Sequence, residues 1–352
     1  MKAVFAIPGD MHRKTGGFIY EAEVLAALNR IGVQTMHLQL PDSFPDPSPH
    51  DMATTLAALA KVPANIPVIL DGFIAGTIDP YGAAQLAAPL LAITHHPLGF
   101  ETGLTTARAS LLVEKERAAL AQMAHVIVPS PHTAAILCSD FGLDEQDITV
   151  APPGFSRPPA HIALPQTPPL ILSVGLLAPR KGHDTLLAAL AEIVDLPWCA
   201  DIVGKAHDAA TTDALHQLRA DLGLDDRVTF SGEIDSASLR ARFGAATLFA
   251  LATRYEGYGM VFGEAMLCGL PIVSCDTGAV PQTVGDAGIL VPPGDAGAFG
   301  AALRQMLTDA DTRVTYASAS AQQGSALPTW EDTAQIIANV IRTVACEDNH
   351  PI

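Results

Sequence analysis

The sequence predicts an α/β protein of two domains, each built on a parallel sheet wrapped by helices. Three observations support this prediction. The chain has 352 residues, which is long for one globular domain. Short β-branched runs alternate with helix-like segments, as they do in folds with parallel sheets. This alternation stops at one proline-rich stretch and then starts again, so the pattern occurs twice along the chain.

The first domain is expected to cover residues 1–155. Apolar, β-branched runs predict strands at 2–7, 33–38, 66–71, 90–94, 125–129 and 147–151. Alanine and leucine at helical spacing predict helices that include 18–32, 104–124 and 131–141. Strand, helix and strand in succession indicate that neighbouring strands run parallel.

Residues 156–168 are expected to link the two domains. The surrounding stretch, 152–169, reads PPGFSRPPAHIALPQTPP and contains seven prolines, which favour an extended connection. The second domain is expected at 169–328, with a last helix at 329–345 that could cross back to the first domain. Its strands are predicted near 169–174, 199–203, 227–231, 247–251, 270–274 and 287–291, and its helices near 183–194, 208–222, 235–244, 259–268 and 295–308.

The composition argues against several classes of protein. Hydrophobic residues make up 49% of the chain and charged residues 16%, so each half can bury a core and disorder is not expected. No apolar stretch reaches the ~20 residues of a membrane-spanning helix, and the N-terminal apolar run is too short for a signal peptide. The net charge of −17 argues against nucleic acid as a partner. Five scattered cysteines without a CxxC pair favour reduced thiols and a cytoplasmic location.

The first candidate site is GLLAPRKGHD, residues 175–184, directly after a predicted strand. Ligands of open α/β sheets bind at the carboxyl ends of the strands. Arg180 and Lys181 stand just before a helix expected to begin near His183, and helix N-termini attract anions. A diphosphate would fit this arrangement. A solvated basic turn would have the same sequence, and this segment alone does not distinguish the two.

The second candidate site is RYEGYGMVFGEAM, residues 254–266, which follows another predicted strand. Seven residues separate Glu256 from Glu264, so the two carboxylates could contact opposite ends of an elongated ligand. Carboxylates suit sugar hydroxyls because they offer several acceptor sites and no donor. The residues after Glu256 would bring backbone close to a ligand at the start of a helix; they are Gly257, Tyr258, Gly259 and Met260. A helix with two surface glutamates is the less favoured interpretation.

At these residues the chain resembles glycosyltransferase family 4. That family carries a glycine-rich basic loop at the start of its C-terminal domain and a Glu-x7-Glu motif farther along. The segment LPIVSCDTGAVPQTVGDAGILVPPGD, residues 270–295, also resembles the family, and the resemblance is strong over 170–308 and weaker before residue 150. It implies the GT-B fold, in which two Rossmann-like domains face each other across a cleft. The N-terminal domain would lie on the acceptor side and the C-terminal domain would bind a nucleotide sugar.

The resemblance also implies roles for the residues that match the family motifs. Lys181, with Arg180 beside it, would bind the donor diphosphate. Glu256 would hold hydroxyls of the transferred sugar, helped by the N–H groups of the four residues that follow it. Glu264 would hold the ribose hydroxyls, and the backbone near 230–233 would face the base. One departure is Leu176, where many relatives have arginine, so either Arg180 supplies the second charge or the diphosphate is held with less positive charge.

The N-terminal half adds two smaller signals. Gly16 and Gly17 lie in the loop between the first strand and the first helix, where the family has paired glycines that let the backbone approach the donor. His95 and His96 end a buried strand, where the family often has a histidine near the reacting carbon. Strand alternation lets only one of them point into a site. Pro97 follows His96 and favours His96 slightly.

The resemblance implies a retaining transfer, and no carboxylate pair stands out as a nucleophile and an acid. We therefore expect displacement on one face of the sugar, with the leaving diphosphate taking the acceptor's proton and with no metal or cofactor. The Asp-x-Asp sequence at Asp309 follows a predicted helix rather than a strand, so it is interpreted as a solvated helix end.

Two rival functions remain open. A sugar-nucleotide epimerase shares this kind of fold but has other motifs, and a non-catalytic or hydrolytic nucleotide-sugar-binding protein would fit the departure at Leu176. The acceptor could be a lipid, a polysaccharide or a small molecule, and the donor's base and sugar are open. Segment 103–124 has apolar positions at helical spacing with Arg108, Lys115 and Arg117, so peripheral membrane contact is an alternative to packing on the sheet.

Overall fold

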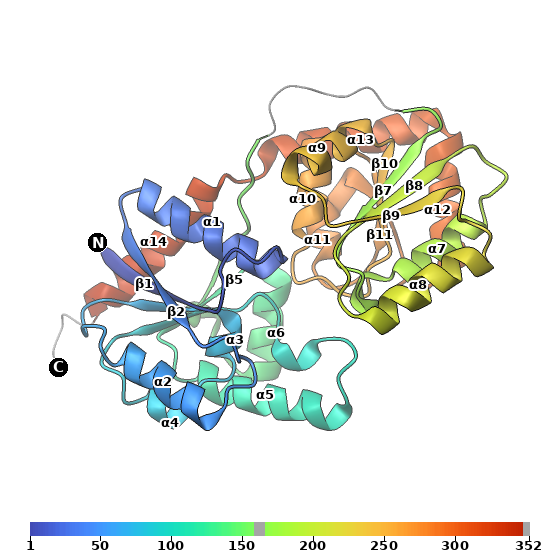
Figure 1. Ribbon diagram of the computed structural model, residues 1–352. Coiled ribbons are helices and arrows are strands. Elements are labelled where there is room, and N and C mark those ends of the chain that lie inside the picture. Colours follow the sequence, from blue (N-terminus) through green and yellow to red (C-terminus); the bar gives the residue numbers. More distant parts are fainter. Residues whose placement is uncertain (158–165, 348–352) are drawn as a thin grey trace. The chain divides into compact units, whose positions relative to one another are not determined.

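Figure 1 shows the computed structural model, which describes residues 1–157 and 166–347. The chain divides into two compact units. The N-terminal unit comprises Met1–Gly154 and the segment that begins at Pro328, and the C-terminal unit comprises Phe155–Leu327. The expected linker, 156–168, lies mostly outside the described residues, because 158–165 are not described.

A six-stranded parallel sheet forms the centre of the N-terminal unit. Its strand order is β2-β1-β3-β4-β5-β6. The strands are β1 (Lys2–Pro8), β2 (Gln34–Leu40), β3 (Val68–Leu70), β4 (Leu90–Ile93), β5 (His125–Val128) and β6 (Ile148–Val150). Each of the six coincides with a strand predicted from the sequence to within a few residues. Continuous apolar runs made the inner strands predictable because both faces of a parallel sheet are buried there, whereas the edge strand β2 is largely exposed.

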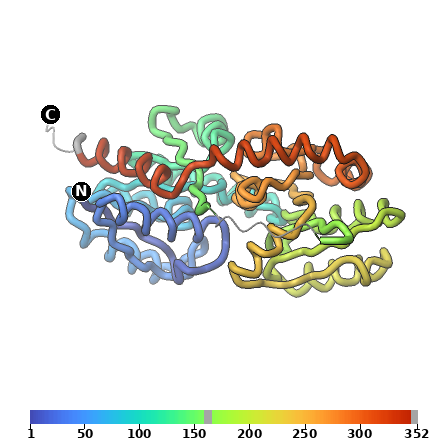
Figure 2. Tube along the Cα trace, turned by 90° about the horizontal axis from the view of Figure 1, so that it is seen from above, coloured from blue at the N-terminus to red at the C-terminus, as the bar shows by residue number. Residues whose placement is uncertain are grey.

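Helices cover both faces of this sheet. One face packs on a shared apolar cluster that includes Leu59, Ala83, Leu120 and Leu137. Those residues come from α2 (Pro49–Leu59), α4 (Pro80–Ala83), α5 (Thr106–Leu120) and α6 (Pro131–Phe141), and α3 (Gly72–Ala75) lies with them. The other face is covered by α1 (Gly16–Arg30) and the C-terminal helix α14 (Trp330–Glu347), which pack together. Figure 2 shows these two helices side by side although they come from opposite ends of the sequence.

Helix α14 is tied to the N-terminal unit by specific contacts at its start. The Trp330 ring meets the Tyr20 ring edge-on at 5.8 Å between centroids. The Thr333 hydroxyl donates to the carbonyl of Pro152 at 2.7 Å. Gly154 lies so close to Trp330 that a Cβ there would come within 2.3 Å of the Trp330 nitrogen. These contacts are made by the expected crossing helix, and they show why it packs within this unit.

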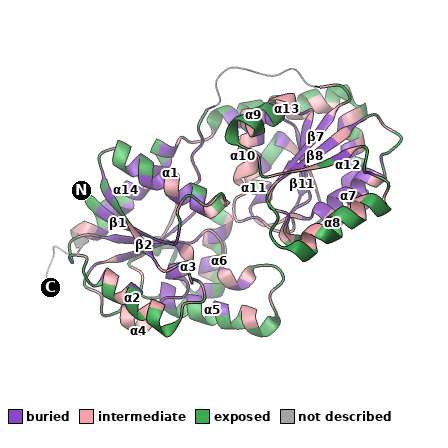
Figure 3. Cartoon of the chain, in the orientation of Figure 1, coloured by how far each residue is buried: buried purple, intermediate pink, exposed green. Residues whose placement is uncertain are grey.

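A second six-stranded parallel sheet forms the centre of the C-terminal unit, in the order β12-β11-β10-β7-β8-β9. The strands are β7 (Leu170–Val174), β8 (Cys199–Val203), β9 (Val228–Gly232), β10 (Leu248–Leu251), β11 (Ile272–Cys275) and β12 (Gly288–Val291). The helices are α7 (His183–Ala191), α8 (Ala209–Asp221), α9 (Ser236–Ala245), α10 (Met260–Leu267), α11 (Val280–Val284), α12 (Ala296–Thr308) and α13 (Ala310–Ala326). Figure 3 shows that the inner strands are buried and that the outer faces of the helices are exposed, while the edge strands β9 and β12 are half-buried.

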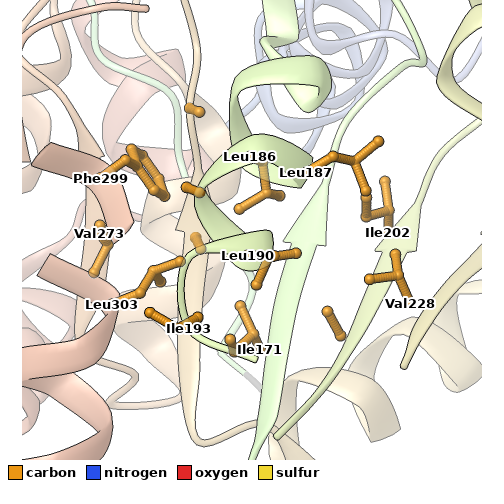
Figure 4. Close-up of a cluster of buried hydrophobic side chains, with 14 of the residues drawn as sticks. Ile171, Leu186, Leu187, Leu190, Ile193, Ile202, Val228, Val273, Phe299 and Leu303 are labelled. Atoms are coloured by element: carbon orange, nitrogen blue, oxygen red, sulfur yellow. The ribbon is translucent and has the colours of Figure 1, made fainter. Parts of the chain in front are cut away.

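The core of this unit consists of two apolar layers, one on each face of the sheet. Figure 4 shows one layer, in which Leu186 and Leu190 of α7 meet Phe299 and Leu303 of α12. The opposite layer contains Phe243 of α9, Phe262 of α10 and Val280 of α11. Both faces are therefore sealed, and the strand ends are the places where polar side chains of the sheet can meet a ligand.

The pattern of apolar residues did not predict helix α13. Its sequence, ADTRVTYASASAQQGSA, has no apolar stripe, and its buried residues are Ser320 and Gly324. A Cβ at Gly324 would lie 2.2 Å from the Met266 carbonyl oxygen. Small residues let α13 approach α10 closely, so this helix depends on backbone proximity rather than on large side chains.

Strand order reverses direction once in each sheet. In the C-terminal unit the chain starts at β7, builds outward to β9, and then returns to β10 on the other side of β7. In the N-terminal unit the equivalent point lies between β1 and β3. The connections after these strands diverge to opposite faces and leave a crevice, which is where ligands of such sheets bind.

Replacing Phe299 by alanine should cost about 3–5 kcal/mol of the free energy of unfolding of the C-terminal unit, because it leaves a cavity in a sealed layer. Phe299 is 0% exposed. Denaturant unfolding measures the change. Val314→Ala on α13 is the control, since Val314 is 62% exposed and should stay within about 0.5 kcal/mol of the parent protein. Equal effects of the two substitutions would contradict this description of the core.

Candidate functional site

An ion pair joins the two candidate segments of the C-terminal unit. The Lys181 ammonium lies 2.6 Å from Glu256 Oε1, and Arg180 Nη1 lies 3.4 Å from Glu256 Oε2. The Thr253 hydroxyl lies 3.1 Å from Glu256 Oε1. Glu256 is only 5% exposed. The structure therefore brings together two cations and one carboxylate that the sequence places far apart.

The topology explains this meeting. Lys181 follows β7 and Glu256 follows β10, and these two strands pair directly at the point where the strand order reverses. Pro179–Lys181 forms a short 3-10 turn, which Gly182 ends with φ of 63°. A Cβ at Gly182 would lie 1.9 Å from the Ala252 carbonyl oxygen. Glycine is therefore required there for the basic loop to lie against the end of β10.

Arg254 holds the same two loops together. Its N–H donates to the Arg180 carbonyl at 2.8 Å. Its guanidinium donates to the Pro179 carbonyl and pairs with Asp184 at 2.6 Å. Sequence reasoning assigned no role to Arg254, although its place directly before Tyr255 and Glu256, after a strand, was a signal that could have found it.

The environment keeps Glu256 ionised despite its burial. Burial alone would raise the pKa of this carboxyl, but the charges of Lys181 and Arg180, together with hydrogen bonds from Lys181 and Thr253, bring that pKa below its ordinary value. The site therefore combines a carboxylate, which accepts hydrogen bonds from hydroxyls, with two cations, which attract anions. That pair of properties suits a ligand that carries both phosphate and sugar.

Glu264 lies in a different environment on the same segment. It is half-buried on α10, and burial raises its pKa to about 7. No cation is recorded against it among the described residues, in contrast to Glu256. Helix α10 starts after Gly259, which has φ of 86°, and the Thr283 hydroxyl donates to the Tyr258 carbonyl at 2.8 Å. The backbone of the loop between β10 and α10 thus holds this loop in place.

The loop around Leu176 is anchored without a charge at that position. The Leu177 N–H donates to the Lys205 carbonyl at 2.9 Å. His183 is 1% exposed, and its Nε2 lies 3.2 Å from the Leu176 carbonyl oxygen. Burial lowers the pKa of His183 to about 4, so it is neutral and donates to that carbonyl. Arg180 instead faces Glu256 and donates to the Tyr255 carbonyl at 3.0 Å.

In the N-terminal unit the paired glycines and one histidine come together. Gly16 and Gly17 begin α1, directly beside the end of β4. A Cβ at Gly17 would lie 3.0 Å from His95 Cδ2, so glycine admits the ring. His95 Nε2 lies 3.3 Å from Glu21 Oε1, whereas the neighbouring His96 Nε2 lies 3.9 Å from Glu101. The structure thus places His95, and not His96, against the paired glycines.

Two buried carboxyls accompany His95 and were not singled out in the sequence. Glu21 is 0% exposed and Asp71 is 4% exposed. Asp71 directly follows β3, at the reversal of strand order, and Glu21 lies one turn inside α1. An acidic residue at the end of an apolar strand was the signal that could have identified Asp71.

The Asp-x-Asp sequence and the cysteines lie outside the two sites described above. Asp309 is the N-cap of α13, where its carboxylate accepts from Asp311 N–H and Thr312 N–H, so the Asp-x-Asp sequence lies at a helix end. Within residues 1–157 and 166–345, no group of three or more His, Cys, Asp or Glu could hold a metal ion. Cys138, Cys199, Cys268 and Cys275 are free thiols.

Helix α5, the candidate for membrane contact, packs on the sheet through Leu112, Ala119 and Leu120. Two of its basic side chains have partners within the unit. Arg108 pairs with Asp46, and Arg117 donates to the Asp140 carbonyl at 2.6 Å. Among the described helices, none is long and apolar enough to cross a membrane.

Comparison with known proteins places this geometry in context. The family model for glycosyl transferases group 1 matches residues 168–309, and the model for glycosyltransferase family 4 matches residues 34–157. A GDP-mannose-dependent alpha-(1-6)-phosphatidylinositol monomannoside mannosyltransferase of Mycobacterium tuberculosis is 30% identical over 49% of this chain and 47% of that protein. A D-inositol 3-phosphate glycosyltransferase of Rhodococcus erythropolis is 28% identical over 67% of this chain and 57% of that protein. The chain spans about half the length of the curated relatives it matches.

Solved structures share the fold over nearly the whole chain. Sucrose-phosphate synthase from Thermosynechococcus elongatus has a TM-score of 0.83 at 23% identity and covers 98% of this chain and 100% of its own. Anabaena HepE in complex with UDP-glucose has a TM-score of 0.75 at 19% identity and covers 97% of this chain and 100% of its own. The predicted fold class is confirmed.

Lys181→Ala should weaken binding of a nucleoside diphosphate about tenfold or more, because a charge-assisted hydrogen bond contributes ~1.5–3 kcal/mol. Titration calorimetry with UDP and GDP measures the change. Arg304→Ala is the matched control, since it removes a cation that pairs with Asp195 elsewhere on the C-terminal unit. Unchanged affinity of the Lys181 variant would contradict the expectation that Lys181 binds a diphosphate.

Proposed function

Because this chain belongs to glycosyltransferase family 4, we propose that it is a retaining glycosyltransferase that moves a hexose-type sugar from a nucleoside-diphosphate sugar to an acceptor hydroxyl. The observation that carries this proposal is the buried Glu256 carboxylate held by Lys181 and Arg180 at the reversal of strand order in the C-terminal sheet. A buried carboxylate paired with two cations is not needed to pack the core of a sheet or to form a surface helix, so a purely structural role explains it less well.

The donor would use both signs of charge at this site. Its diphosphate would lie against Lys181 and Arg180, and the hydroxyls of its sugar would donate to Glu256. The N–H groups at the start of α10 would add donors, from Gly257 to Met260. Glu264, farther along α10, would accept hydrogen bonds from the ribose hydroxyls. Each carboxylate would therefore bind a different part of the same ligand.

The transfer would proceed on one face of the sugar. The bond between the anomeric carbon and the phosphate oxygen breaks while the acceptor oxygen bonds to the same face, so the configuration is retained. The acceptor's proton passes to an oxygen of the leaving diphosphate. Lys181 and Arg180 would stabilise the negative charge that develops on that group, which is the part a metal ion plays elsewhere. We therefore propose a metal-independent reaction.

The donor base and the acceptor are questions for screening. One matched relative is named as GDP-mannose-dependent, and one matched structure contains UDP-glucose. Nucleotide sugars with both bases should be tested for thermal stabilisation, because a ligand at about 100 times its dissociation constant adds about 2.7 kcal/mol. Stabilising donors are then assayed with lipid, polysaccharide and small-molecule acceptors, with and without vesicles. Stabilisation without transfer to any acceptor would favour a binding or hydrolytic protein.

We also propose a cytoplasmic location, because the free thiols fit a reducing compartment.

The two glutamates should separate by role. Glu264→Gln should weaken nucleoside diphosphate and nucleotide sugar alike, because both contain the ribose. Glu256→Gln should spare the nucleoside diphosphate and lower turnover. Since burial places the pKa of Glu264 at about 7, its carboxylate forms as pH rises through 7, and wild-type affinity relative to Glu264→Gln should rise by up to about tenfold between pH 6 and 8. Comparing the two proteins at each pH cancels the ionisation of the phosphate. Equal effects of both variants on the free nucleotide would reverse the proposed orientation.

Of the two histidines, we propose that His95 takes part in transfer, because its ring lies against Gly17. His95→Ala should lower turnover ~10²–10⁴-fold, the usual range for a positioned acid–base or polarising group. Nucleotide affinity should hardly change, because the nucleotide contacts proposed above lie on the C-terminal unit. His96→Ala is the neighbouring control, and melting temperatures are measured in parallel. Full activity of the His95 variant would exclude this histidine from the chemistry.

A further inference from the structure

Three ionisable side chains meet at the carboxyl edge of the N-terminal sheet, and the proposed function uses only one of them. Glu21 of α1 lies between Asp71, which follows β3, and His95, which follows β4. Glu21 Oε2 is buried and has no hydrogen-bond donor among the described residues, and the Asp71 carboxyl lies close enough to share a proton with it. Glu21 Oε1 lies 3.3 Å from His95 Nε2. The three groups form a chain of hydrogen bonds that ends at the histidine.

The two carboxyls cannot both be ionised. They are 0% and 4% exposed, and two buried charges of the same sign in contact would be strongly unfavourable. Arg13 is a cation whose charge reaches Asp71, but it pairs with Asp42 and is 38% exposed, so water screens its attraction. Tyr20 also faces Glu21 but is neutral, and its hydroxyl donates to the Ala151 carbonyl. Protons on the carboxyls are therefore the means of neutralising them.

The hydrogen bonds that these side chains already make give the chain of hydrogen bonds a direction. Asp71 Oδ1 already accepts the Phe73 N–H at 2.8 Å, so the acid proton of Asp71 is directed to Glu21. Among the described residues, the acceptor recorded by distance for a proton on Glu21 Oε1 is His95 Nε2, at 3.3 Å. A histidine that accepts at Nε2 carries its proton on Nδ1. Burial raises the pKa of Glu21 to about 8 and that of Asp71 well above its ordinary value, and it lowers the pKa of His95 to about 4, as this direction requires.

The surroundings fix the ring in the same orientation. The Tyr20 ring meets the His95 ring edge-on at 5.0 Å between centroids, and Gly17 leaves room for His95 Cδ2. Nδ1 has no hydrogen-bond partner among the described residues, and a quarter of the His95 side chain is exposed. Nδ1 is therefore the ring nitrogen that is free to meet a ligand.

We propose that Glu21, oriented by Asp71, is a positioning residue that holds His95 as its Nδ1–H tautomer, so that His95 donates a hydrogen bond to an oxygen of the sugar. The consequence for transfer rests on the proposed function, but the tautomer belongs to the free protein. His95 then acts as a neutral donor and not as a base. Above pH 8, Glu21 ionises and accepts from His95 Nε2–H, so Nδ1 stops being a donor.

The test is ¹⁵N NMR of the full chain labelled at histidine, without ligand. The chain has 12 histidines, and the spectrum of His95→Ala identifies the signals of His95. At pH 7, His95 should carry its proton on Nδ1, and the proton should move to Nε2 as pH passes 8. Glu21→Gln cannot ionise and still donates through its amide, so the proton should stay on Nδ1 at pH 9. Glu21→Leu should favour Nε2–H, the form that free histidine prefers.

Wild-type His95 with its proton on Nε2 at pH 7 would overturn the inference, even if Glu21→Leu does not fold. In assays of transfer, the rate of the wild-type protein should decline above pH 8, where Nδ1 stops being a donor. Glu21→Gln should have the wild-type rate at pH 7 and should not show this decline. Glu21→Leu should fall about 10- to 100-fold, as found for residues that orient metal-bound histidines. If His95 shows the predicted tautomers but neither the wild-type protein nor any variant transfers a sugar, the proposed function would be refuted and the positioning role of Glu21 would remain. A Gln variant that loses rate as the Leu variant does would refute the positioning role.

Discussion

The C-terminal site depends on the burial of the Glu256 carboxylate. An ionised carboxyl that is 5% exposed is stable only if opposite charges and hydrogen bonds replace the water it has lost. Lys181, Arg180 and Thr253 supply that replacement. The loops after β7 and β10 must therefore lie against each other, which is why Gly182 has no room for a side chain and why Arg254 bonds to both loops. A buried charge thus sets the shape of the loops on which a donor would rest.

The N-terminal unit also buries carboxyl groups, but it stabilises them in a different way. Glu21 and Asp71 are as deeply buried as Glu256, but the cation near them is screened and engaged elsewhere. Their pKa values rise, whereas the pKa of Glu256 falls. One unit therefore presents a carboxylate between cations, and the other presents a neutral hydrogen-bonded chain that ends at His95. The first arrangement suits a charged ligand, and the second suits the orientation of a neutral donor.

The departure at Leu176 can be understood in the same terms. Without arginine there, the loop is held through the backbone, by Lys205 on one side and the buried His183 on the other. Arg180 occupies the position beside Glu256. The second positive charge of this loop therefore lies at the carboxylate, on the same turn as Lys181. The family resemblance identified the departure, but it did not show where the remaining charge would lie.

The sequence by itself determined the strands, the two-sheet fold and the family, because continuous apolar runs and glycine-rich motifs are local and carry their meaning without a partner. It also singled out Lys181, Glu256 and the paired glycines as candidates, and the structure places them at the reversals of strand order. It did not reveal α13, whose small polar residues have no periodic pattern, or Arg254, Glu21 and Asp71. Those side chains acquire their roles from neighbours that are distant in sequence. Only the tertiary structure decided which histidine meets Gly17 and which carboxyl is charged, because burial and pairing are properties of the folded chain.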